Sequence, residues 1–447
     1  MLITHAKVAT LGEAPRLIED GAILIRDQHI AAIDTTSTLA TAHPEEERLD
    51  AQGQLALPAL LCGHTHFYGA FARGWAYPGS AATRFVDILE RLWWRLDKHL
   101  TLEDVRYSAL VCLADAIRHG TTTLIDHHAS PNAIDGSLDV IAETVVQSGL
   151  RAGLSYEVTD RDGPDRAQAG IAENIRFLQR LQRAPHPQLG ATFGMHASLT
   201  LSDATLSRVV AAADSLGAGC HIHGAEGIED VEDSLAKSGM RAVTRLGAAG
   251  VLGPNTIVAH AVHVDDQEIA LLAETDTWVT HQPRSNMNNA VGFARIEDML
   301  KHGVKVALGN DGFSNNMVAE MKAAYLGHKL VQRDPRSMPA DLVFQLAYTA
   351  NANLVTSFWP QQQLGELTTD AMADIILVDY KPTTPLTAAN LPWHIIFGYE
   401  ASAITTTISA GQILMRDRRI LTLDENHINA RARDLARLLW KRISAST

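Results

Sequence analysis

The chain has 447 residues, of which 46% are hydrophobic and 20% charged, and its formal net charge is −13. This balance predicts a soluble globular protein with one large domain and a smaller one, and the acidity argues against nucleic acid or an anionic membrane as a partner. Three cysteines are too few for a disulfide framework, and we find neither a signal peptide nor an apolar run of the ~18 residues that a membrane span needs. We therefore expect a cytoplasmic protein.

Residues 1–56 have the character of short β-strands. Two apolar runs at 22–26 and 29–34 are separated by Asp27-Gln28, which predicts a hairpin. Nothing in this segment has the pattern of a catalytic motif, so we interpret it as part of a small β-domain.

The next stretch, Leu60-Leu61-Cys62-Gly63-His64-Thr65-His66, is an apolar run that ends in two histidines. Residues i and i+2 of a strand face the same side, so His64 and His66 would lie together at the carboxyl end of this strand. Two neutral imidazoles on one face are half of a transition-metal site. Taken alone, the pair is equally compatible with ordinary hydrogen-bonded histidines.

Strand and helix patterns alternate from residue 57 to 365. Thr101 and Asp104 form a capping-box pattern that starts a helix, and Gly120 ends it. Eight strand candidates lie at 60–66, 121–126, 151–156, 189–196, 219–223, 256–260, 278–281 and 304–311. Eight such units over about 300 residues predict an α/β fold, a parallel (β/α)8 TIM barrel. A doubly wound open sheet is the alternative, but we find no glycine-rich phosphate loop to support it.

Residues 366–447 return to short strands, at 374–379, 404–408 and 411–415, and end in an amphipathic helix over 425–444. These strands are similar in style to those of the N-terminal segment. We predict that both chain ends pair into one small β-sandwich domain beside the barrel. The expected boundaries are 1–56 and 366–447 for the small domain and 57–365 for the barrel.

A barrel of this kind carries its active site at the carboxyl ends of its strands. Besides His64 and His66, the polar residues at predicted strand ends are His196, His223, His260, His281 and Asp311. Of the pair His221 and His223, we favour His223 for the site because it lies last on its strand, and we expect His221 to face the other way as a core histidine.

Three imidazoles and a carboxylate suit Zn(II) or Fe(II) and leave room for a water molecule, whose pKa such an ion lowers to ~7. Hydrolysis then needs a proton shuttle, and Glu226, three residues after His223, is the candidate. The alternative for Glu226 is a solvated position at the start of the acidic run 226–233.

A set of short motifs appears in order along nearly the whole chain. They are Pro58 with Gly63-His64-Thr65-His66, Arg73-Gly74, Gly120-Thr121-Thr122-Thr123, His223-Gly224-Ala225-Glu226, Ala259-His260, Ser285-Asn286-Met287 and Leu308-Gly309-Asn310-Asp311-Gly312. Together they resemble the amidohydrolase superfamily, in its mononuclear cytosine-deaminase-like and chlorohydrolase branch. Finer features, such as Leu92-Trp93-Trp94-Arg95-Leu96-Asp97 and Asp126-His127-His128, look like the SsnA-type aminohydrolases.

The resemblance implies one divalent metal held by His64, His66, His223 and Asp311, a proton shuttle at Glu226, an orienting role for His260 and a second proton acceptor at Asp311. It also implies substrate contact by His196 and His281. The implied reaction is hydrolytic loss of ammonia from an amidine-type carbon of a purine, pterin or pyrimidine. A homodimer is a further expectation from the family.

The sequence leaves the place of four further residues open. Arg284, three residues after His281, would either face the pocket and pair with a substrate carbonyl or carboxylate, or lie on the surface. Trp75 would roof the mouth of the barrel, because the loop after the first strand is long and rich in aromatic residues. Trp93 and Trp94 fit either this roof or a core or dimer contact.

Three other functions fit part of this pattern. A binuclear hydrolase of this superfamily commonly needs a bridging lysine, and no lysine occurs between Lys98 and Lys237. A triazine-type dechlorinase is a second rival, but related dechlorinases lack the glutamate that corresponds to Glu226. A non-catalytic metal-binding protein is the third, and candidates for every catalytic role argue against it.

Overall fold

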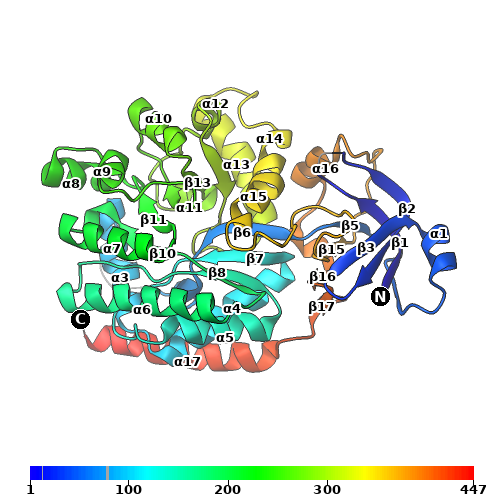
Figure 1. The fold of residues 1–447 in the computed structure, drawn as a ribbon, viewed down its shortest axis with the longest axis horizontal. Coiled ribbons are helices and arrows are strands. Elements are labelled where there is room, and N and C mark those ends of the chain that lie inside the picture. The colour runs from blue at the N-terminus through cyan, green and yellow to red at the C-terminus, as the bar shows by residue number, and fades with distance from the viewer. Residues whose placement is uncertain (13, 77–79, 447) are drawn as a thin grey trace.

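The computed structural model describes residues 1–12, 14–76 and 80–446 and consists of a barrel with a smaller sheet at one side (Figure 1). The barrel strands are β6 (Leu60–Thr65), β7 (Thr121–Asp126), β8 (Arg151–Leu154), β9 (Leu189–Ala191), β10 (Phe193–Ala197), β11 (Cys220–Gly224), β12 (Ile257–His260), β13 (Trp278–His281) and β14 (Lys305–Leu308). They pair in parallel in the orders β6-β7-β8-β9 and β10-β11-β12-β13-β14.

Two isolated parallel bridges join these two groups of strands into a closed barrel. Thr65 pairs with Asp311 where β6 meets the end of β14, and Val158 pairs with Met195 beside β10. The predicted (β/α)8 barrel is thereby confirmed.

The fourth strand differs from the prediction, which had it continuous over 189–196. It divides at Thr192, whose amide donates to Leu154 O at 3.2 Å, whereas the amide of Phe193 donates to Gly219 O at 2.9 Å. The strand therefore pairs first with β8 and then with β11, so its two halves belong to different sheets.

Helices follow the strands and cover the outside of the barrel (Figure 1). They are α4 (Leu102–Arg118), α5 (Ser137–Ser148), α6 (Pro164–Arg183), α7 (Asp203–Ser215), α8 (Ile228–Ser238), α9 (Ala242–Ala248), α10 (Asp266–Glu274), α11 (Pro283–Asn288), α12 (Ile296–Lys301), α13 (Met317–Gln332), α14 (Ala340–Gln345), η4 (Leu346–Ala350) and α15 (Asn351–Thr356). Thr101 and Asp104 make both hydrogen bonds of the predicted capping box at the start of α4.

The connection from β6 to α4 is a long excursion with several short helices. These are η1 (Phe67–Ala72), α2 (Phe85–Ile88), η2 (Leu89–Trp93) and α3 (Trp94–Lys98). The excursion carries a cluster of aromatic side chains, so it can provide an apolar wall for a pocket at the end of β6.

Both chain ends meet in the smaller sheet, coloured blue and orange in Figure 1. Its strands are β1 (Leu2–Ala9), β2 (Leu17–Arg26), β3 (His29–Thr35), β4 (Arg48–Asp50), β5 (Leu55–Pro58), β15 (Ile375–Val378), β16 (Ile404–Ser409), β17 (Gln412–Arg416) and β18 (Arg419–Ile420). β5 lies between β1 and β15, which confirms the predicted pairing of the two ends. The predicted boundaries at 57 and 366 stay a prediction.

The remaining helices are α1 (Thr36–Ala42), η3 (Ser198–Thr200), α16 (Leu391–Gly398), η5 (Ala401–Ala403) and α17 (Glu425–Ala445). α17 returns to the barrel, where Trp440 Nε1 donates to Phe71 O at 2.9 Å and Arg442 pairs with Asp104. Among the described residues, no helix is long and apolar enough to cross a membrane.

Candidate active site

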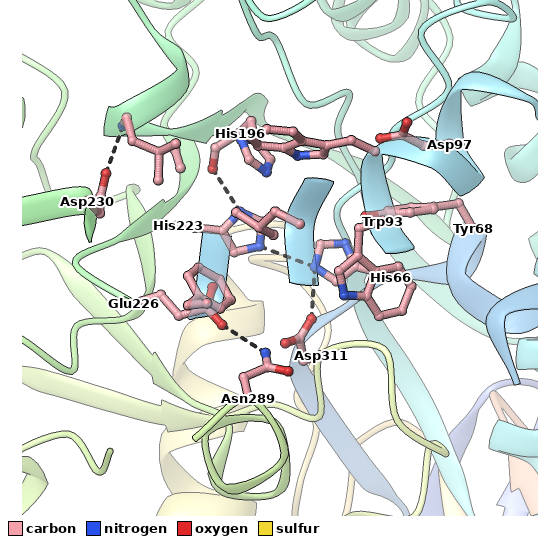
Figure 2. A pocket seen from close by; sticks show the side chains of 15 residues that line it. His66, Tyr68, Trp93, Asp97, His196, His223, Glu226, Asp230, Asn289 and Asp311 are labelled. Carbon is pink, nitrogen blue, oxygen red and sulfur yellow. Dashed lines mark hydrogen bonds and ion pairs between the residues drawn. The ribbon is translucent and has the colours of Figure 1, made fainter. Parts of the chain in front are cut away.

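At the ends of β6, β11 and β14, the side chains of His66, His223 and Asp311 point into one space (Figure 2). His66 Nε2 lies 3.0 Å from Asp311 Oδ1 and 3.2 Å from His223 Nε2. His64 Nε2 lies 3.8 Å from the same Asp311 oxygen. The structure thus brings together the four residues that the sequence offered as metal ligands, and His64, His223 and His260 also form a compact group.

The seam between β6 and β14 fixes two of these residues relative to each other. Asn310 and Asp311 donate their amides to His64 O at 2.9 and 3.1 Å, and His66 donates its amide to Asp311 O at 3.3 Å. A Cβ on Gly309 would lie 2.9 Å from the backbone of His64. Only glycine therefore fits where the two strands approach.

The backbone turns sharply at the strand ends that carry the site. Ala225, His260 and Asp311 have φ values of 50°, 74° and 57°, a region that residues other than glycine rarely adopt. Such conformations cost free energy and cluster at functional sites, where they aim side chains that a regular strand could not.

Each of the four site histidines is held at Nδ1. His66 Nδ1 donates to His127 O at 2.5 Å, His223 Nδ1 to His196 O at 2.7 Å and His260 Nδ1 to Asn286 Oδ1 at 2.9 Å. His64 Nδ1 lies 2.8 Å from His221 Nε2. The Nε2 atoms are left to face the shared space, which is how second partners orient metal-binding imidazoles.

The expectation that His221 faces away from the site is therefore wrong. Residues 221 and 223 lie two apart on β11 and so share a face, by the same alternation that brings His64 and His66 together. His221 is fully buried and contacts His64, one layer behind the site.

Glu226 and its neighbours form the other half of the site. Glu226 Oε2 lies 3.4 Å from His260 Nε2, and Asn289 Nδ2 donates to Glu226 Oε1 at 3.2 Å. Ser285 accepts from Asn289 at 3.3 Å and donates to Asp311. The alternative of a solvated Glu226 is excluded, since the residue is only 8% exposed.

Burial and charge set the ionisation of these groups. Burial lowers the pKa of His64, with the neighbouring imidazoles adding to the shift, and it lowers the pKa of His223 and His260. Burial opposes protonation of His66 as well, but hydrogen bonds to Asp311 and Glu157 outweigh it and raise the pKa of His66. Burial, with the nearby charge of Asp311, raises the pKa of Glu226 to about 8.

The site opens into a pocket with an aromatic wall. The excursion after β6 supplies Tyr68, Phe85, Leu89, Trp93, Trp94 and Asp97, and the barrel supplies His66, His196, Ala197, Leu199, His223, Glu226, Asp230, Asn289 and Asp311. His196 lines it as predicted, held by Thr200 Oγ1 at 2.8 Å from its Nδ1. Such a wall suits a planar ring.

Comparison with known proteins identifies the family. Residues 55–414 match the model of the Amidohydrolase family. The chain belongs to the amidohydrolase family. A 5'-deoxyadenosine deaminase of Methanosarcina mazei is 32% identical over all of this chain and 99% of its own length. A 5-methylthioadenosine/S-adenosylhomocysteine deaminase of Syntrophomonas wolfei is 32% identical over 98% of this chain and 99% of its own.

Solved structures share the fold of this amidohydrolase. An adenosine deaminase from Xanthomonas campestris with bound zinc superposes with a TM-score of 0.85 at 23% identity, covering 99% of this chain and 98% of that one. The atrazine chlorohydrolase of Arthrobacter aurescens gives 0.80 at 20% identity, covering 97% and 99%. The sequence relatives confirm the predicted reaction class, hydrolytic deamination of a nitrogen heterocycle.

Three predicted substrate contacts of this amidohydrolase lie outside the residues that line the pocket. Arg284 Nε donates to Glu320 Oε1 at 2.6 Å and Arg284 Nη2 to Ser314 O at 2.7 Å, because the buried Glu320 carboxylate needs a cation. His281 is fully buried beside His328. Trp75 packs half-buried against the core.

Three polar residues in and around the pocket were not chosen as site residues from the sequence: Glu157 and Asp97, which are buried, and Asn289, which is half-buried. Glu157 lies 3.3 Å from His66 Nδ1, just beyond β8, and the rule of collecting polar residues at strand ends would have found it. Asn289 is the C-cap residue of α11, four positions after Ser285. Asp97 lies in a helical excursion, where no strand pattern points to it.

Proposed function

We propose that this amidohydrolase deaminates an adenosine-type nucleoside, releasing the exocyclic amino group of the purine as ammonia. The observation that carries the proposal is the geometry of the pocket. Glu226, His260 and Asp311 meet at one end of it, and Figure 2 places the buried carboxylate of Asp97 on the other side of the histidines.

We propose that His64, His66, His223 and Asp311 hold one divalent ion, with zinc preferred and iron second, since the ligand types suit both. The Nε2 atoms of His64 and His260 are buried and have no hydrogen-bond partner among the described residues, which suits them to bind a cation. When bound, the ion would lower the pKa of a water molecule and aid its attack on the purine carbon.

The chain's own groups then move the protons. Glu226 takes a proton from the attacking water and delivers it to the ring nitrogen next to the reacting carbon. His260, 3.4 Å from Glu226, is placed to hydrogen-bond the incoming oxygen, and Asp311 accepts the second proton of the water. Asp311 passes this proton to the exocyclic amino group, the C–N bond breaks, ammonia leaves, and the oxygen stays on the ring as a carbonyl.

The position of Asp97 favours a nucleoside over a free base as the substrate. It lines the pocket, is 1% exposed, and has one oxygen, Oδ1, without a hydrogen-bond partner among the described residues, while Oδ2 pairs with Arg161. A carboxylate oxygen of this kind can accept a hydrogen bond from a sugar hydroxyl. The named substrates of both sequence relatives are adenosine derivatives.

Ammonia release from a matched panel tests the proposal. Adenosine, 5'-deoxyadenosine and 5'-methylthioadenosine are compared with adenine and guanine, and zinc and iron in the purified protein are measured in parallel. We expect turnover of the ribosides and at least tenfold lower kcat/KM for the free bases. Preference for a free base, or turnover of none of the panel by fully metallated protein, would contradict the proposal.

The variant Asp97→Asn tests sugar binding separately from the chemistry at the other end of the pocket. We expect KM for the ribosides to rise about 10- to 100-fold, because an amide is a weaker acceptor and removes the carboxylate charge that pairs with Arg161. The rate on adenine should be unchanged. Chloride release from 6-chloropurine riboside, at a higher rate than ammonia release from adenosine, would favour the dechlorinase instead.

Further features of the proposal rest on sequence alone. They are the placement among SsnA-type aminohydrolases, the cytoplasmic location and the homodimer. Size-exclusion chromatography with light scattering tests the last of these.

A further inference from the structure

We propose that His221 is a positioning residue that fixes His64 as a metal ligand, an inference that rests on the proposed metal-dependent function. The two imidazoles are 0% exposed, and His64 Nδ1 lies 2.8 Å from His221 Nε2. The ring planes stand at 74°, so the lone pair of one ring nitrogen can meet the N–H of the other edge to edge.

The hydrogen-bond partner of His64 Nδ1 differs in kind from the partners of the other three site histidines. His66 and His223 donate from Nδ1 to backbone carbonyls, and His260 donates to the amide oxygen of Asn286. A carbonyl or amide oxygen can only accept a hydrogen bond, so each of these three histidines must carry its hydrogen on Nδ1. The acceptor for His64 is an imidazole, which can accept or donate.

Only one arrangement of the pair leaves His64 Nε2 free to bind a cation. His64 must carry its hydrogen on Nδ1, so His221 must accept at Nε2 and carry its own hydrogen on Nδ1. His221 therefore decides which nitrogen of His64 faces the site. Without it, a buried N–H would lack an acceptor and the His64 ring could rotate.

A second imidazole holds His221 in place from behind. The ring of His127 stacks on it with centroids 4.3 Å apart and planes at 14°. His127 is itself fully buried, and its backbone oxygen accepts from His66. His127 thus holds His66 directly, through its backbone oxygen, and holds His64 indirectly, by stacking on His221.

Zinc affinity of the full-length protein, measured by competition with a chromogenic chelator, tests the inference without reference to activity. H221F keeps a ring but removes the acceptor, and we expect the zinc Kd to rise about 10- to 100-fold. H221Q places an amide oxygen near the former Nε2 and should recover most of the loss. H328F is the matched control, because His328 makes a similar buried contact with His281, 3.1 Å away, and touches no proposed ligand.

The outcomes separate this inference from the proposed function. Equal zinc affinity of folded H221F and the unchanged protein would overturn the inference alone, as would a loss in H221Q as large as in H221F or an equal loss in H328F. Failure of the unchanged protein to bind zinc or iron would overturn the proposed function, and the inference with it. If H221F does not fold, H221L takes its place against H221Q.

Discussion

At the residue scale, the site contains two kinds of group: the four proposed metal ligands, and Glu226, which is proposed to transfer protons. The four proposed ligands touch one another through Nε2 and Oδ1, whereas Glu226 stands beside His260 and Asn289. Removing the proton shuttle should therefore leave the metal in place, and removing the metal should leave the shuttle intact.

Glu226→Gln tests the first half of this division. The amide keeps the shape and the contact with Asn289 but cannot accept a proton, so we expect kcat to fall about 10²- to 10⁴-fold with zinc content unchanged. Steady-state kinetics with elemental analysis measures both. E232Q, at an exposed position of the same acidic run, is the control and should behave like the unchanged protein.

Metal removal tests the second half. Without a cation, the buried Nε2 atoms of His64 and His260 have no hydrogen-bond partner in the described part of the chain, so chelator dialysis should abolish activity and lower the melting temperature. Adding Zn²⁺ or Fe²⁺ should restore both, which differential scanning calorimetry and the ammonia assay follow. A chelated protein that melts at the same temperature would argue against a site formed by these residues.

Asn289 offers a finer test at the same scale. Its amide donates to Glu226 Oε1 at 3.2 Å and to Ser285 at 3.3 Å, so it fixes the carboxyl that moves the proton. Asn289→Asp replaces the donor with a repelling charge of the same shape, and we expect kcat to fall about 10- to 100-fold while zinc affinity is kept. Wild-type kcat in this variant would mean that Glu226 needs no such support.

At the element scale, the parallel barrel explains how much the sequence could predict. Polar residues at strand ends must gather at one mouth, so His66, His223 and Asp311 were found although up to 247 positions separate the β6 pair from Asp311. The prediction was wrong for His221, which shares a strand face with His223, and it did not include Glu157, which lies just beyond the end of β8. The division of the fourth strand at Thr192 follows from its two neighbours, which no local pattern encodes.

The close approach of β6 and β14 makes a prediction at this scale. A Cβ at Gly309 would lie 2.9 Å from His64 N, O and Cβ, so Gly309→Ala must push one strand away from the other. We expect the variant to lose about 1–3 kcal/mol of unfolding free energy and to bind zinc more weakly, because His64 and Asp311 move apart. Urea unfolding and chelator competition measure the two effects.

The control for this variant is Gly253→Ala. A Cβ there would meet nothing within 4 Å, so neither stability nor zinc affinity should change. An equally tolerated Gly309→Ala would show that the seam between the two ligand-bearing strands has more freedom than these contacts allow.

At the scale of the whole molecule, the two ends of the chain form a sheet that the sequence predicted only in outline. The likeness of the two terminal segments indicated that they pair. The order, with β5 between β1 and β15, depends on contacts across more than 300 residues and could not be derived from local patterns. This sheet lies beside the barrel, and β5 leads directly into β6, so its attachment bears on the stability of the barrel (Figure 1).

A buried ion pair links the two parts. Arg151, at the start of β8, pairs with Asp374, just before β15, at 2.5 Å, and the two side chains are 1% and 4% exposed. Asp374 Oδ1 also accepts from the amide of Ala410, at the turn between β16 and β17.

Asp374→Asn leaves the Arg151 charge buried without its counterion, and we expect a loss of about 3–5 kcal/mol of unfolding free energy. D139N, which breaks the surface pairs with Arg176 and Arg180, should cost less than about 1 kcal/mol. Asp374 touches none of the pocket residues, so kcat and KM of folded D374N at low temperature should match those of the unchanged protein. If folded D374N also loses activity at low temperature, the small sheet shapes the site as well.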